Sequence, residues 1–62
     1  MNIDYELLRK DLLNYFGTAM IHNPVAIIEL SKVQRASNSE LETIATKNGF
    51  NLRDYEVYVF TL

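Results

Sequence analysis

The chain has 62 residues, of which 48% are hydrophobic and 23% are charged, and its formal net charge is −2. This composition predicts one small globular domain over residues 1–62 and excludes an intrinsically disordered chain. The mild charge gives no basic patch for a polyanion partner, and the longest apolar run, residues 25–28, is far shorter than the ~20 residues of a membrane span. Without cysteine and with one histidine, the chain offers neither a disulfide nor a multi-histidine zinc site.

The first predicted helix covers about residues 4–21. Asp4 is suited to its N-cap, and the apolar residues that follow form one stripe at helical spacing: Tyr5, Leu8, Leu12, Tyr15, Phe16 and Ala19. Gly17 costs about 1 kcal/mol relative to alanine inside a helix. We expect the helix to continue because Ala19 stays on the stripe, and residues 17–19 would then let another helix cross closely. The alternative is a helix that ends near Phe16.

The second predicted helix covers about residues 24–35. Asn23 is a favourable N-cap, and Pro24 at the first helical position loses no hydrogen bond. Ala26, Leu30 and Val33 line the expected buried face. Ile28 does not fit this stripe and is expected on the polar side of the helix.

The third predicted helix covers about residues 38–48. Ser37 and Glu40 match a capping box, and Ser39 with Glu42 is a second match. Gly49 is suited to the left-handed position that ends a helix, so we expect it to have positive φ.

The C-terminal residues 57–62 differ from the rest, because they are β-branched and aromatic as in a strand. The sequence shows no second strong strand, so this segment should either pack as irregular chain or pair with another chain. The predicted fold is therefore all-α, a compact three-helix domain (about 4–21, 24–35 and 38–48) with an apolar, strand-like C-terminal extension. The expected core consists of Tyr5, Leu8, Leu12, Tyr15, Phe16, Ala26, Leu30, Val33, Leu41, Ile44, Ala45, Phe50 and Leu52.

The polar residues do not form a pattern typical of catalysis. The carboxylates are scattered, the glycines stand alone, and His22 lies between two predicted helices without a nucleophile and an orienting acid beside it in sequence. We therefore expect no enzyme, no cofactor and no metal site. The N-terminus, Met1 to Asp4, lacks the basic region of a signal peptide, so a cytoplasmic protein is expected.

Residues near Gly49 have two further interpretations. Ala45-x-x-x-Gly49 followed by a second segment resembles a helix-turn-helix, whose recognition helix would start near Asn51. Residues 51–60 carry one base and two acids, so they would make few phosphate contacts. Nucleic acid is therefore the alternative partner rather than the leading one.

Residues 23–57 also resemble the Nif11-type domain of bacterial leader peptides, on the Asn-Pro start, the Ser-x-x-Glu cap and the Gly49-Phe50 turn. That resemblance implies a helical recognition module that a modifying enzyme binds.

The leading functional hypothesis is a non-enzymatic protein-interaction or regulatory module that self-associates or binds a protein partner. Ile3, Leu7 and Leu13 lie off the stripe of the first helix, and a three-helix core of this size cannot cover them together with the tail. The candidate interface residues are Ile28, Val57, Tyr58, Val59 and Phe60.

Overall fold

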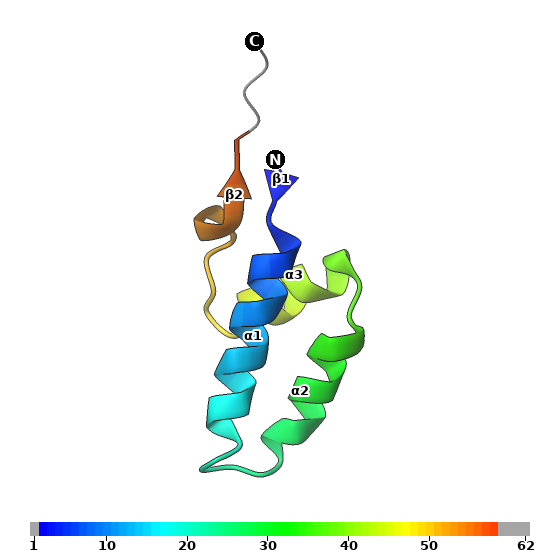
Figure 1. Ribbon diagram of the computed structural model, residues 1–62, viewed down its shortest axis with the longest axis vertical. Helices are drawn as coiled ribbons and strands as arrows, with labels where there is room; N and C mark the ends of the chain where they lie inside the picture. Colours follow the sequence, from blue (N-terminus) through cyan, green and yellow to red (C-terminus); the bar gives the residue numbers. More distant parts are fainter. Residues whose placement is uncertain (1, 59–62) are drawn as a thin grey trace.

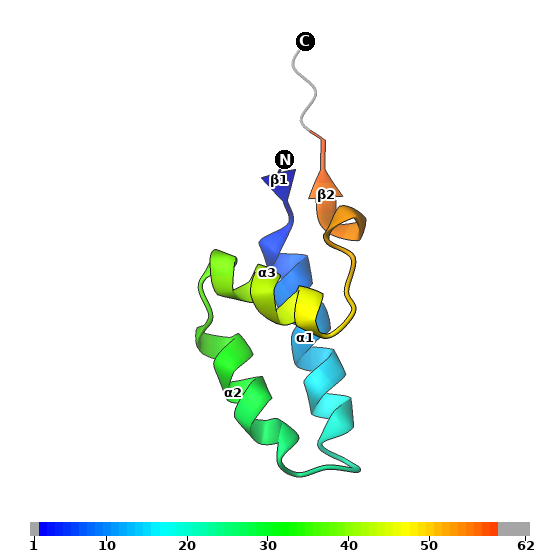
Figure 2. The ribbon, with the colours of Figure 1, turned by 180° about the vertical axis from the view of Figure 1, so that it is seen from behind.

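A computed structural model describes residues 2–58 of the chain, with three α-helices as its main elements. They are α1 (Tyr5–Ala19), α2 (Ala26–Arg35) and α3 (Asn38–Lys47). Helices α1 and α2 form an antiparallel hairpin, and α3 crosses it (Figure 1, Figure 2). The predicted all-α, three-helix fold is confirmed.

Helix α1 begins at Asp4, as predicted, because the Asp4 side chain accepts a hydrogen bond of 3.1 Å from the amide of Leu7. The helix continues through Gly17 and ends at Ala19, two residues before the predicted end. The close helix crossing expected at residues 17–19 is wrong for Gly17, because a Cβ built on this residue would meet nothing within 4 Å. Gly17 is therefore an ordinary helical position without a packing role.

Helix α2 begins with a tight turn that shifts its regular part to Ala26. The N-cap of α2 is Val25 and makes no side-chain cap bond, so the predicted N-cap at Asn23 and the first helical position at Pro24 are wrong. The Asn23 side chain accepts a hydrogen bond of 3.3 Å from the amide of Val25 within the turn before the helix. The next amides bond three residues back, Ala26 to Asn23 and Ile27 to Pro24, which is the 3₁₀ pattern common at helix ends. At the other end, the Arg9 guanidinium donates to the backbone carbonyls of Val33, Gln34 and Ala36.

Helix α3 has the capping box predicted at Ser37 and Glu40, with both reciprocal hydrogen bonds present. At its C-terminus Gly49 has a φ of +82°, which confirms the left-handed position. The amide of Phe50 donates to Ala45 at 2.9 Å, and that of Gly49 donates to Thr46 at 3.2 Å. These two bonds together form the Schellman motif, which turns the chain back along the domain.

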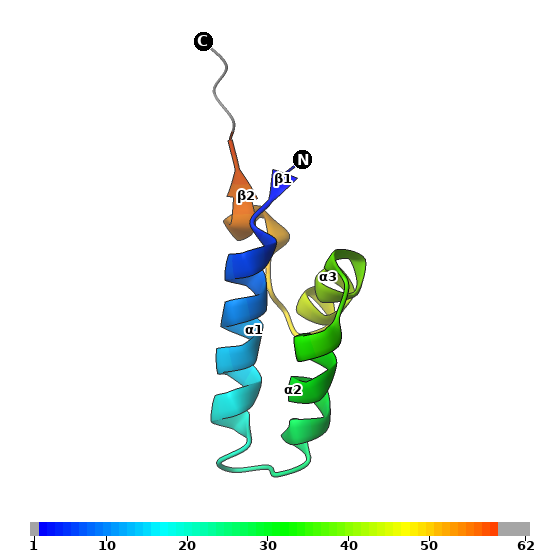
Figure 3. The ribbon, with the colours of Figure 1, turned by 45° about the vertical axis from the view of Figure 1, so that its right-hand side comes forward.

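The segment after α3 returns to the N-terminus and forms a small sheet there. A 3₁₀ turn η1 (Leu52–Tyr55) leads into β2 (Glu56–Val57), which pairs antiparallel with β1 (Asn2–Ile3). The first and last described segments thus lie side by side, at the end of the molecule away from the α1–α2 turn (Figure 3). The expectation that the chain offers no internal strand partner is wrong for Val57, because Val57 pairs with Asn2. No strand signal precedes the Asp4 cap in the sequence, because β1 consists of only two residues. Val59 and Phe60 lie outside the described residues.

The core lies where α1, α2 and α3 meet. The prediction is confirmed for its buried members, which are Leu8, Leu12, Phe16, Ala26, Val33, Leu41 and Ala45. Other expected members are half-buried against this cluster: Tyr5, Leu30, Ile44, Phe50 and Leu52. Tyr15 is a wrong prediction, because it is 47% exposed and its ring lies edge-on to those of Phe16 and Phe50. Ala36 and Tyr55 are buried but were not predicted, and Ile3 and Leu13 are covered rather than exposed.

Candidate interaction surface

Large apolar side chains are exposed mainly around the turn that joins α1 to α2. In this region Ile21 is exposed at 76%, Val25 at 64% and Ile28 at 54% of their full accessible area, and at the other end of the molecule Tyr58 is exposed at 77%. Ile28 is therefore on the surface, as its position off the helix stripe predicted. Scattered exposed apolar residues are normal on a soluble protein, whereas a group of them is typical of a binding surface.

A groove of about 270 Å³, here called the hairpin groove, lies beside these residues between the C-terminal half of α1 and the start of α2. The side chains of Tyr15, Val25 and Ile28 line it, and each of them is 47% exposed or more. The remaining lining residues are Phe16, Ala19, Asn23, Ala26, Glu29 and Asn48. The hairpin groove therefore has a mixed lining, in which exposed apolar side chains lie beside the polar residues Asn23, Glu29 and Asn48.

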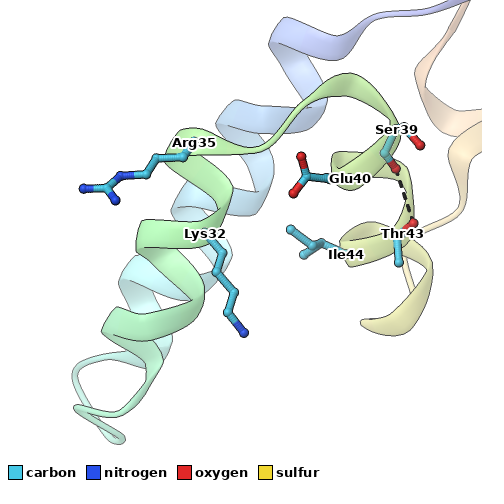
Figure 4. Close-up of a pocket in the computed structure, with 6 residues that line it drawn as sticks. All are labelled: Lys32, Arg35, Ser39, Glu40, Thr43 and Ile44. Atoms are coloured by element: carbon cyan, nitrogen blue, oxygen red, sulfur yellow. Dashed lines mark hydrogen bonds between the residues drawn. The ribbon is translucent and has the colours of Figure 1, made fainter.

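A larger groove of about 430 Å³ lies between α2 and α3 (Figure 4). The side chains of Lys32, Glu40 and Ile44 extend into it, whereas that of Arg35 points away. Lys32 already pairs with Glu29 at 3.3 Å. The Glu40 carboxylate accepts a hydrogen bond from the Ser37 amide. This backbone hydrogen bond is the main cause that holds the pKa of Glu40 below its usual value, and a hydrogen bond with the Ser37 side chain is the second cause. The two charged side chains that extend into this groove, Lys32 and Glu40, therefore already bond to residues of their own helices or helix caps.

Two tyrosine–carboxylate hydrogen bonds join α1 to the segments packed against it, one to α3 and one to η1. The Tyr55 hydroxyl donates to Asp11 at 2.6 Å, and the Tyr5 hydroxyl donates to Glu42. The pKa of Tyr55 is raised to about 12, mainly by burial. The hydrogen bond to Asp11 and the negative charges of Asp11 and Asp54 also contribute to this rise. The bond to Glu42, followed by burial and the Glu42 charge, raises the pKa of Tyr5. A phenol with a raised pKa is a weaker acid, so both hydroxyls stay protonated near neutral pH and keep donating to their carboxylates.

Within residues 2–58, no group of three or more histidine, cysteine, aspartate or glutamate residues is placed to hold a metal ion. His22 is exposed in the α1–α2 turn, and its backbone amide donates to Ala19. Among the described helices, none combines the length and apolar character that crossing a membrane requires.

Of the predicted interface residues, Ile28, Val57 and Tyr58 lie within the described part of the chain, and these three do not share one surface. Ile28 lines the hairpin groove near the start of α2, whereas Val57 (43% exposed) and Tyr58 (77% exposed) lie at the sheet end. These two ends are opposite one another along the molecule (Figure 1). Sequence analysis missed Tyr15, Ile21 and Val25 as exposed apolar residues. Tyr15 falls on the helix stripe, and the turn that exposes Ile21 was expected to be helical.

The residues after Gly49 do not form the second helix that a helix-turn-helix requires. Leu52–Tyr55 is a single 3₁₀ turn and leads directly into β2. Its neighbouring charges are Arg53, Asp54 and Glu56, which give no basic surface for phosphate contacts.

Comparison of the chain with protein families, with curated proteins and with solved structures finds no match. The functional proposal below therefore rests on the geometry of the surface.

Proposed function

We propose that this chain is a non-enzymatic protein-interaction module that self-associates. The observation that carries the proposal is the group of exposed apolar side chains Ile21, Val25 and Ile28 at the α1–α2 turn, two of which line the hairpin groove. Water in contact with such a group is unfavourable, and covering it with a protein surface releases about 25 cal/mol per Å² of apolar area buried. A regulatory role in the cytoplasm belongs to the same proposal.

The size of the domain favours self-association. A single core in a chain this short rarely supplies more than about 3–5 kcal/mol, and small domains therefore often add disulfides, a metal ion or a partner chain. The chain has no cysteine, and residues 2–58 hold no cluster of metal-ligating side chains. A partner chain is the stabilising addition that remains, either a second copy or another protein, because binding only to the folded state raises the apparent stability of that state.

The recognition role implied by the Nif11-type resemblance belongs to the same functional class. A helical module that a modifying enzyme binds would also need an exposed apolar surface on its helices. The proposal keeps self-association as the leading activity because it requires no partner of a second kind.

Sedimentation equilibrium of the full chain tests the proposal. The mass of one chain is 7.2 kDa. We expect the weight-average mass to rise from this value toward twice this value as the concentration increases from low to high micromolar. A mass that stays at that of one chain throughout this range would contradict the proposal.

A further inference from the structure

The dipeptide Asn48-Gly49 at the end of α3 is the most reactive asparagine position in the sequence. The chain has six asparagines, and only Asn48 is followed by glycine. The amide of an asparagine side chain can be attacked by the backbone nitrogen of the next residue. The attack is easiest before glycine, because glycine has no Cβ in the way and its backbone adopts conformations closed to other residues. Asn48 therefore has the greatest intrinsic tendency in this chain to lose its side-chain amide as ammonia.

This deamidation needs no reagent other than water. The Gly49 nitrogen forms a bond to Asn48 Cγ, the Cγ–Nδ2 bond breaks, and the proton of the Gly49 amide leaves with Nδ2 as ammonia. The product is a five-membered succinimide ring. Water then adds to one of the two ring carbonyls. Cleavage of the bond from nitrogen to Cγ gives aspartate, and cleavage of the bond from nitrogen to the backbone carbonyl carbon gives isoaspartate, whose main chain runs through the former side chain.

The folded end of α3 holds the reacting atoms apart. The ring closes only when the Gly49 nitrogen turns toward Asn48 Cβ about the Cα–C bond. At Asn48 ψ is 14°, so the Gly49 nitrogen nearly eclipses the backbone nitrogen of Asn48 and points away from Cβ. Asn48 Nδ2 also donates to the Ile44 carbonyl at 2.8 Å, and the Gly49 amide donates at 3.2 Å to the carbonyl of Thr46. Both hydrogen bonds must break before the ring can close.

This end of the helix lies at the surface. Gly49 is exposed, Asn48 is half-buried, and both line a hollow of about 360 Å³. Water therefore reaches a succinimide formed here. Opening of a helix end requires less free energy than unfolding of the whole domain.

Neither product restores the closed turn. A carboxylate has no N–H to donate to the Ile44 carbonyl, and its charge lies at the negative end of the α3 dipole. Isoaspartate also inserts an additional main-chain carbon into the turn that the 2.9 Å bond from the Phe50 amide to the Ala45 carbonyl closes. The modified helix end should therefore open more readily than the original one.

We infer that Asn48 is a deamidation site, which the C-cap of α3 keeps unreactive in the folded chain and which reacts when that helix end opens. The modification is then a permanent mark of opening. All the groups involved belong to one chain, so the inference does not depend on the proposed self-association.

Incubation of the full chain at low concentration in mildly alkaline buffer, with and without concentrated urea, measures the protection. Peptide mass spectrometry locates each amide replaced by a carboxylate, and enzymatic methylation detects isoaspartate. We expect the reaction at Asn48 to be at least about tenfold slower in the folded chain, because opening must precede it. Asn51, which precedes leucine, should react more slowly than Asn48 in urea. Equal rates at Asn48 with and without urea, or a faster reaction at Asn51, would overturn the inference.

Two truncated side chains separate opening of the helix end from unfolding of the domain. Phe50 is half-buried against the core, and an apolar residue after the glycine of a Schellman motif packs on the last helical turn. Ile3 is also half-buried against the core but belongs to β1. We expect Phe50→Ala to accelerate the reaction at Asn48 at least about threefold in the folded chain and Ile3→Ala to change it less than about twofold. Far-UV circular dichroism verifies that both variants fold, and equal acceleration by the two would overturn the role of the C-cap.

The variant Asn48→Asp reproduces one of the products. We expect it to lower Tm by about 4 °C or more, because a hydrogen bond is lost and a charge is added at the helix end. Asn51→Asp is the matched control, because it adds the same charge nearby and keeps the side-chain oxygen that accepts from the Arg53 amide. Its Tm should change by less than about 2 °C. Equal decreases in Tm for the two variants would contradict the claim that the product fails to close the turn.

Discussion

Arg9 should contribute more to stability than any other cation of the described chain, because it connects α1 to the end of α2. Its guanidinium donates to the carbonyl oxygens of Val33 at 2.5 Å, Ala36 at 2.7 Å and Gln34 at 3.3 Å. These carbonyls lie at the C-terminus of α2, where the last helical carbonyls lack partners within the helix and the helix dipole is negative. The Arg9→Met variant keeps most of the aliphatic stem and removes the donors and the charge.

The expected cost follows from two contributions. Hydrogen bonds that involve a charged group contribute about 1.5–3 kcal/mol, and a cation at a helix C-terminus contributes about 0.3–1 kcal/mol. Arg9 is half-exposed, so the lower part of each range applies. We expect Arg9→Met to lower the free energy of unfolding by about 2 kcal/mol, which is a large fraction of the ~3–5 kcal/mol that a core of this size supplies.

Thermal unfolding at one low protein concentration measures this effect without a contribution from self-association. A change of 1 kcal/mol shifts Tm by roughly 4–8 °C in a domain of this size, so we expect a decrease of about 8–16 °C. Lys10→Met is the matched control, because Lys10 is the next residue, is exposed, and its side chain makes no hydrogen bond or ion pair within residues 2–58. The reasoning is refuted if the two variants unfold within about 0.5 kcal/mol of one another.

Three further outcomes can be measured. Gly49→Val should lower the free energy of unfolding by more than about 1 kcal/mol, because φ is +82° at this position. Gly49→Asn should lower it less, because asparagine tolerates this region. Equal melting temperatures of Gly49→Val and the wild-type chain would exclude the C-cap role of Gly49. The pKa of Tyr55 is raised to about 12, so the stability it provides is complete below its ordinary pKa near 10 and is lost as pH rises toward 12; Tyr55→Phe should remove this part of the alkaline decrease in melting temperature, and an unchanged pH profile would contradict it. We also expect no DNA or RNA binding at physiological salt, so a gel shift at micromolar protein that weakens with salt would favour the nucleic-acid alternative.

The three helices could be predicted from the sequence because the signals that define them are local. Asp4 accepts a hydrogen bond from an amide three residues away, the capping box joins Ser37 to Glu40, and Gly49 adopts positive φ directly after α3. Each signal involves residues within one helical turn, and the apolar stripes repeat at the same short interval. The alternation of such signals therefore determined the order, type and approximate bounds of the helices.

The tertiary structure decided which distant residues meet. Ile3 pairs with Glu56, and Arg9 reaches the carbonyl of Ala36, although nothing near these residues in sequence indicates the contact. The same applies to Tyr15, which lies on the helix stripe yet remains 47% exposed. Its position depends on how far the second half of α1 extends beyond α3.

The candidate surface was only partly predictable for the same reason. The position of Ile28 off its helix stripe indicated exposure, and periodicity within one helix is sufficient for that prediction. Periodicity cannot tell how two helices are placed in space, so the hairpin groove that joins Tyr15 to Val25 and Ile28 emerged only from the packing of α1 against α2. The sequence by itself determined the three helices and the exposure of Ile28, and the tertiary structure decided which other side chains leave the core and which of them share a face. The physical reason is that local hydrogen bonds and periodicity act within a few residues, whereas a surface is assembled from segments far apart in the chain.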